Sequence, residues 1–384
     1  MDFELDDDQR ELQAAAADIL TKECPPAYLR GVVEGDHEAE DLWTTLCGLD
    51  WPGLAIPEED GGLGTTAVES AIVVEELGYV GDPTPFLATT TQFAPLVRRC
   101  ATAAQRKRLL GAVVAGGSGT VAIADHTGAW DPGAPPIGAT RSGDGWTLSG
   151  SASFVVDGDR AEEIAVVARA DTGPEVFIVP AAEVTTERAT SFDPALHVAT
   201  VTFDGVTVDD DHRLGGDDVA AGVAAALDEA TIGLATHMAG SCRRGLDMAL
   251  EYVREREQFG VPIGSFQAVK HKAVDMYVAV ERAGALALFA ALTVAEDDDR
   301  RSVAASMAKA AAGDAQRIVV EHAIQLFGGI GFTWENDLHL YLRRAKAGEL
   351  LFGGAAEHRA RVARAVQASG GLEHWNDERG AASA

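Results

Sequence analysis

The sequence predicts a mainly helical α+β protein with an N-terminal helical domain, a central small β-barrel or sandwich, and a C-terminal four-helix bundle. Apolar residues recur with helical spacing up to about residue 114, alternate over about 119–213, and then return to helical spacing. A chain of 384 residues is long enough for two or three domains. We predict domains at 1–118, 119–215 and 216–369, followed by a mobile tail over 370–384.

Three helices are predicted in the N-terminal domain. Residues 3–19 place apolar side chains roughly on one stripe, and Pro25 and Pro26 end that helix. A glycine-rich loop over 51–64 leads into a helix that begins at Thr65 or Thr66 and ends near residue 77. A further amphipathic helix spans 102–114 and stops at a pair of glycines.

The middle of the chain reads as about eight short β segments separated by turn residues. The run Gly143-Asp144-Gly145 lies between two such segments and is typical of a hairpin turn. Ala199, Val201 and Phe203 alternate with threonines, as in a half-buried strand. This density of short strands predicts a small barrel or sandwich.

Long helices return after residue 217. Those we predict cover 221–256, 267–295, 302–327 and 355–368. Gly328 and Gly329 follow the third helix and are expected to cap it. Antiparallel helices of this length indicate a four-helix bundle.

Composition excludes several classes of function. The net charge of −29 argues against nucleic acid and against anionic membrane surfaces, since both require a positive field. The sequence has no uninterrupted run of eighteen apolar residues and an acidic rather than basic start, so we expect neither a membrane span nor a secretory leader. The four cysteines have no metal-ligand spacing, so we expect free thiols, no metal site and a cytoplasmic protein.

Four motifs, in chain order, resemble those of acyl-CoA dehydrogenases. Residues 55–62 (AIPEEDGG) resemble the P-E-x-x-G-G turn of that family, and 201–208 (VTFDGVTV) resemble the strand that closes its β domain. Residues 256–271 (REQFGVPIGSFQAVKH) match R-x-x-F-G-x-x-[IL]-x-x-F-Q-x-x-x-H, and 325–331 (QLFGGIG) match Q-x-x-G-G-x-G. The resemblance covers nearly the whole chain and implies FAD as cofactor, an acyl-CoA substrate and an electron-transfer flavoprotein as acceptor.

In that family the last two motifs reach across a subunit interface to the FAD of the neighbouring chain. An Arg guanidinium pairs well with pyrophosphate oxygens, and glycines allow a close approach of backbone N–H groups. The resemblance therefore implies a set of residues that contact FAD in a partner subunit: Arg256, Gln258, Phe259, Gln325, Gly328 and Gly329.

Contacts to the chain's own flavin ring are largely lost. Residues 122–130 (AIADHTGAW) replace the family's T-E-P-x-x-G-S-D segment. In 150–158 (GSASFVVDG), Phe154 stands for the flavin-stacking Trp, and Val156 for a hydrogen-bonding Thr. Valine has the size of threonine but no hydroxyl.

The catalytic base is also missing, because α,β-desaturation of a thioester requires a carboxylate to remove the α proton. Gly353 stands at the family's usual Glu position, and Ala230 stands at the alternative one on the helix before the R-x-x-F-G motif. Three carboxylates remain as candidates for a base at another position: Glu349, Glu229 and Asp125. Because one residue along a helix turns the side chain by about 100°, Glu229 is expected to point away from the direction of Ala230.

Three hypotheses follow from the sequence. The first, preferred, is a non-catalytic subunit that pairs with a homologous catalytic chain, as in the α2β2 bacterial dehydrogenases that act on bulky acyl-CoAs such as those with sterol side chains. The second is a self-sufficient homomeric dehydrogenase with a displaced base. The third is a flavin-free acyl-CoA-binding scaffold on the same fold.

Overall fold

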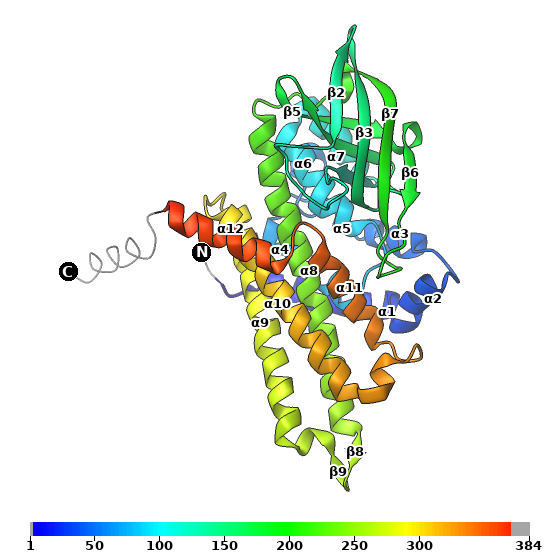
Figure 1. Ribbon diagram of the computed structural model, residues 1–384, viewed down its shortest axis with the longest axis vertical. Helices are drawn as coiled ribbons and strands as arrows, with labels where there is room; N and C mark the ends of the chain where they lie inside the picture. The colour runs from blue at the N-terminus through cyan, green and yellow to red at the C-terminus, as the bar shows by residue number, and fades with distance from the viewer. Residues whose placement is uncertain (1–2, 370–384) are drawn as a thin grey trace, which may run out of the picture.

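The computed structural model describes residues 3–369 and confirms the predicted fold class (Figure 1). N-terminal helices come first, a mixed β-sheet follows, and long helices complete the chain. The sheet lies at one end of the molecule, and the tips of the longest helices lie at the other. The tail predicted over 370–384 lies outside the described residues.

The three predicted N-terminal helices are confirmed, and each begins with a capping box. Thr66 and Glu69 cap one of these helices reciprocally, and Thr102 and Gln105 cap another. The helices of this part are α1 (Asp7–Glu23), α2 (Pro26–Glu34), α3 (Glu40–Gly48), α4 (Ala67–Val80), α5 (Phe86–Ala88), α6 (Ala94–Cys100) and α7 (Ala103–Val114). A π-helical turn, Thr89–Phe93, joins α5 to α6.

The central sheet contains seven strands in the order β1-β4-β2-β3-β7-β6, with β5 paired to β4. Its strands are β1 (Gly119–Ala122), β2 (Ile137–Ser142), β3 (Gly145–Val156), β4 (Glu163–Ala170), β5 (Gly173–Pro180), β6 (Thr185–Arg188) and β7 (Val198–Asp209). The predicted hairpin joins β2 to β3, with Ser142 opposite Gly145. The sheet is mixed because β4 runs parallel to both β1 and β2, a pairing that alternation along one strand cannot reveal.

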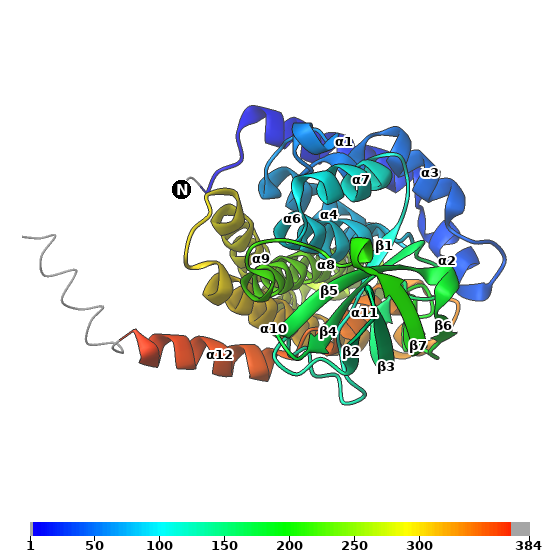
Figure 2. The same ribbon diagram turned by 90° about the horizontal axis from the view of Figure 1, so that it is seen from above.

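The C-terminal helices form a bundle that differs from the predicted one in a single member. The helices are α8 (Val219–Glu255), α9 (Gln267–Ala295), α10 (Arg301–Phe327), α11 (Leu338–Leu350) and α12 (Ala355–Ala368). The fourth bundle position belongs to α11, which packs on α8 and α10, whereas α12 packs on α10 and extends away from the body (Figure 2). The sequence did not predict α11, because charged residues interrupt its apolar positions and one of them, Arg344, is buried in an ion pair with Asp193.

One hydrophobic core joins the sheet to both sets of helices. Val121 and Val167 of the sheet, Leu87 of α5, Val223 of α8 and Phe352 after α11 belong to the same buried cluster. By length and composition alone α8 and α9 could cross a membrane, but core helices of a bundle pass the same test. The shared core fixes the position of the cleft between sheet and bundle.

Candidate functional site

The cleft between the sheet and the bundle is packed with apolar side chains. The space left there admits little more than a single water molecule. Its walls come from β1, β4, α6, α8 and the segment after α11: Gln92, Leu96, Val121, Val167, Val223, Ala226, Leu227, Ala230 and Phe352. We call this space the closed cleft.

An aromatic stack closes the cleft from the sheet side. The rings of Trp130 and Phe352 lie 4.0 Å apart between centroids and are inclined by 28°. Both side chains are buried, and Phe352 has a backbone φ of 56°, a conformation that costs a bulky residue energy. The surrounding core therefore holds Phe352 against Trp130, a contact that the sequence did not predict.

Both family positions for the catalytic base carry no carboxylate, one of them in the wall of the closed cleft and the other next to the wall residue Phe352. Ala230 lines the cleft directly. Gly353 has φ of 91°, and a Cβ built on it would lie 2.8 Å from Oε2 of Glu357. A glutamate at 353 would thus meet both backbone strain and a like charge. Glu357 itself pairs with Arg361 and is half exposed.

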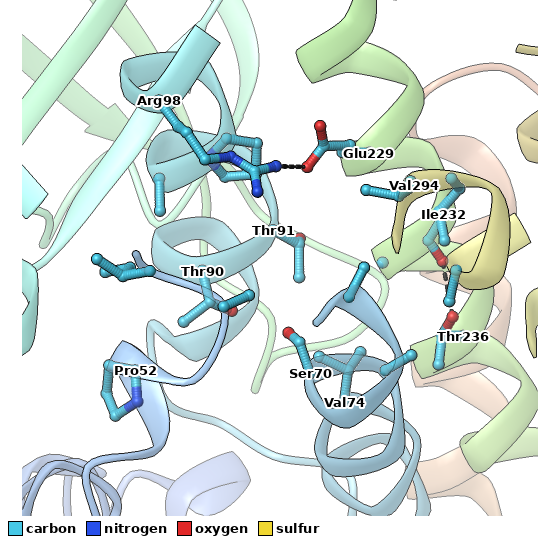
Figure 3. A pocket seen from close by; sticks show the side chains of 18 of the residues that line it. Pro52, Ser70, Val74, Thr90, Thr91, Arg98, Glu229, Ile232, Thr236 and Val294 are labelled. Carbon is cyan, nitrogen blue, oxygen red and sulfur yellow. Dashed lines mark hydrogen bonds and ion pairs between the residues drawn. The ribbon is translucent and has the colours of Figure 1, made fainter. Parts of the chain in front are cut away.

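Glu229 points away from the closed cleft, as predicted. It lines a different pocket between α4, α6 and α8, shown in Figure 3. Its carboxylate accepts hydrogen bonds from the guanidinium groups of Arg98 and Arg99. Two nitrogens of Arg99 lie 2.8 and 2.9 Å from Oε1 of Glu229. Glu229 is therefore engaged in structural ion pairs with two guanidinium groups.

Asp125 and Glu349 are also engaged in local structure. Asp125 accepts hydrogen bonds from the hydroxyl of Thr127 and from the backbone N–H groups of Ala129 and Thr127, and these bonds lower its pKa. Glu349 accepts from the N–H of Ala355 at 2.9 Å and so caps the start of α12. Neither carboxylate lines the closed cleft.

A buried lysine fixes the turn that carries Gly353. The Lys309 ammonium donates to the carbonyl oxygens of Gly353 at 2.8 Å and of Glu349 at 3.2 Å. Its side chain is fully buried, and burial lowers its pKa to about 8. This role could not be predicted from the sequence, because a lysine is most often found on a solvent-exposed helix face.

The positions that should face a flavin ring on the sheet do not offer its usual contacts. Val156 is fully buried in the core beneath the closed cleft. Phe154 adopts φ of 55° at a bulge of β3 and lies partly exposed beside Gly128. Neither side chain can donate or accept a hydrogen bond, so these two positions offer a flavin no polar contact from a side chain.

The opposite end of the bundle is open and polar. After α8 the chain forms a small hairpin, β8 (Glu257–Gln258) and β9 (Val261–Pro262), which projects from the tip of the bundle (Figure 1). Phe259 occupies its turn with φ of 57°, and its side chain is 94% exposed. Within residues 3–369, no ion pair or side-chain hydrogen bond engages Arg256.

The glycine motif ends α10 at the same end of the molecule. Tyr252, one turn before Arg256, stacks on Phe327 at 4.3 Å, so the ends of α8 and α10 lie together. Gly328, with φ of 63°, ends α10 and begins a 3-10 turn, Gly328–Phe332. Gln325 and Gly329 are exposed beside it. We call these residues the open face: Arg256, Gln258, Phe259, Gln325, Gly328 and Gly329.

FAD does not fit the closed cleft but suits the open face. The closed cleft has no volume for a flavin ring, and Gln92 is the single polar side chain in its wall. The open face presents an unpaired guanidinium, an amide, an exposed ring and backbone without Cβ atoms, which are groups that bind a dinucleotide. The assignment of individual residues to FAD stays a prediction.

Comparisons with known proteins agree with this architecture. Residues 6–117 match the acyl-CoA dehydrogenase N-terminal domain, and 221–367 match the acyl-CoA dehydrogenase C-terminal domain. A relative named acyl-CoA dehydrogenase IpdE2, from Mycolicibacterium smegmatis, is 30% identical over 92% of this chain and 98% of its own.

Two solved structures extend the likeness to three dimensions. One is the ChsE4-ChsE5 complex from Mycobacterium tuberculosis, with a TM-score of 0.87, 28% identity, and coverage of 96% of this chain and 99% of that one. The other is a variant of the Tcur3481-Tcur3483 steroid ACAD, with a TM-score of 0.85, 32% identity, and coverage of 94% and 98%.

The helical, sheet and helical parts in this order define a class of flavin-dependent oxidoreductases that act on acyl-CoA thioesters. Matches to both domains and to a full-length relative assign the chain within that class. The chain belongs to the acyl-CoA dehydrogenase family.

Proposed function

We propose that this chain is the non-catalytic subunit of a heteromeric acyl-CoA dehydrogenase. Its open face contributes Arg256, Gln325 and the glycine turn to an FAD that is held mainly by a homologous catalytic subunit. That subunit provides the base and the contacts to the flavin ring. Electrons pass to an electron-transfer flavoprotein, and the complex works in the cytoplasm.

The observation that carries the proposal is the closed cleft. Trp130 and Phe352 stack beside the closed cleft, which has no volume for a flavin ring, and both positions for the base lack a carboxylate. The three displaced carboxylates are each held by structural partners. Without a carboxylate at the thioester, proton abstraction has no acceptor.

The relatives support a paired assembly and a bulky substrate. One solved neighbour is a complex of two different chains, and another is described as a steroid ACAD. We accordingly propose a sterol-derived or similarly bulky acyl-CoA as substrate.

Co-expression tests the proposal. The chain would be purified alone and together with each homologous acyl-CoA dehydrogenase chain of the same genome, and flavin absorbance and acyl-CoA-dependent dye reduction would be recorded. We expect a colourless, inactive chain alone and a yellow, active complex with one homologue. Turnover by the chain alone would establish the self-sufficient enzyme, and thioester binding without flavin in every combination would establish the scaffold.

A further inference from the structure

A wide groove lies between α10 and α11, on the side of the bundle away from the closed cleft. Its volume is about 600 Å³. Val320 and Ile324 of α10 and Leu342 of α11 form an apolar floor. The 3-10 turn that carries Gly328 and Gly329 continues into the groove wall, so the groove borders the open face.

Exposed aromatic side chains form the rim of the groove. Phe332 is 78% exposed, Phe192 is 61% exposed and Trp334 is 44% exposed. Rings of this size are rarely left in water together on one surface, and such a patch marks a site of protein association. Gln316 lies at the base, buried, with no hydrogen bond to its amide within residues 3–369.

The groove carries an excess of positive charge. Arg317, Arg343 and Lys346 line it, against one carboxylate, Glu321, which lies 3.9 Å from Arg317. Within the described part of the chain, Arg343 and Lys346 have no carboxylate within 4 Å. The chain as a whole has 31 basic and 60 acidic residues, so a groove with two cations that lack a carboxylate partner differs in sign from the net charge of the protein.

Two aromatic rings lie against the guanidinium of Arg343. Its guanidinium lies 5.7 Å from the ring centroid of Phe192 and 5.2 Å from that of Trp334. Stacking against rings fixes the plane of the guanidinium while its N–H groups at the edge remain free. A carboxylate that arrives in this plane can accept two parallel hydrogen bonds.

We infer that this groove is a docking site for the catalytic partner subunit. The occupant is a segment of that subunit with an apolar side chain that covers the floor between Phe332 and Phe192, flanked by carboxylates that pair with Arg343 and Lys346. The inference rests on the proposed function and adds where the partner is anchored. Charge complementarity carries it, together with the continuity between the groove and the open face.

The test uses the flavin-containing pair found by co-expression. The double substitution Arg343→Glu/Lys346→Glu and the single substitution Phe332→Asp are introduced into this chain, and the dissociation constant of the pair is measured at low and high salt. The matched control is Lys107→Glu/Arg108→Glu on α7, which changes the net charge equally at exposed positions far along the chain.

We expect the groove variants to weaken the pair at least about 30-fold at low salt, with a loss of bound flavin, while the control changes affinity less than about threefold. Unchanged melting of the lone variants shows that they fold. If both double variants weaken the pair equally, or if neither weakens it, the docking site is wrong and the proposed function still stands. A wild-type chain that pairs with no homologue overturns both.

Two other occupants are distinguishable outcomes that also contradict the inference. Self-association of the wild-type chain that is lost in Arg343→Glu/Lys346→Glu assigns the groove to a second copy. Saturable binding of ADP to the lone chain that is lost in the same variant assigns it to a nucleotide.

Discussion

The closed cleft and the open face lie at opposite ends of the same long helices and have undergone opposite changes. At the closed cleft, polar and catalytic groups of the family are replaced by Ala230, Gly353 and a Trp130–Phe352 stack. At the open face, the family motif is intact, its side chains are largely exposed, and the Arg256 guanidinium has no ion pair within residues 3–369. A chain that keeps the residues it would lend to a neighbour's cofactor, while its own site has lost the catalytic groups, is typical of a subunit that completes a neighbour's site.

The largest effect is expected from opening the closed cleft. Trp130→Ala removes a buried ring and its stack with Phe352, which should lower the free energy of unfolding of the lone chain by about 3–5 kcal/mol. Urea denaturation measures this loss, with the partly exposed Phe154→Ala as control, expected to cost less than about 1 kcal/mol. Flavin binding by the lone variant, or a cost as small as that of the control, would contradict a packed cleft.

A substitution on the open face should weaken the binding of the partner's flavin and leave the stability of this chain unchanged. Arg256→Gln removes the cation that we propose pairs with the FAD pyrophosphate, and we expect the co-expressed pair to release FAD at least about 30-fold more readily. Arg254→Gln, also exposed on the last turn of α8, is the control. The proposed role of Arg256 is wrong if flavin retention is the same in both variants.

Restoring the carboxylate at 353 should fail. Gly353→Glu places a side chain at φ of 91° and against Glu357, so we expect a loss of about 1–2 kcal/mol in stability and no dehydrogenation by the lone chain. Gly353→Asn, whose residue type tolerates positive φ, should cost less. Activity gained by Gly353→Glu alone would show that the cleft admits both substrate and flavin.

The smallest effect is expected from the displaced carboxylates. Asp125→Asn, Glu229→Gln and Glu349→Gln in this chain should each leave turnover of the active pair within about twofold. Loss of a true general base lowers turnover by about 10²–10⁴. Such a drop in one variant, with normal flavin content, would identify a base in this chain.

Much of the fold was predictable, because capping residues and periodicity act locally. Thr66 with Glu69 and Thr102 with Gln105 mark helix starts that the structure reproduces within two residues. Helix α11 was missed since tertiary contacts, such as Arg344 with Asp193, replaced its local pattern. The parallel pairing of β4 depends on contacts between distant segments, which no single strand encodes.

The site was predictable where it depends on motifs and not where it depends on packing. The vacancy at Ala230 and the orientation of Glu229 follow from sequence spacing along α8, and the vacancy at Gly353 follows from the motif after α11. The Trp130–Phe352 stack brings together a loop of the sheet and the end of α11, more than two hundred residues apart, and Lys309 reaches a turn on another element. Such contacts follow from the tertiary structure alone.

The ratio of FAD to protein in the purified heteromer tests the central claim most directly. If one subunit holds the flavin and the other completes its site, quantitative absorbance should give one FAD for every two chains. One FAD for every chain would mean that the closed cleft opens in the complex and binds a flavin of its own, and it would contradict the account.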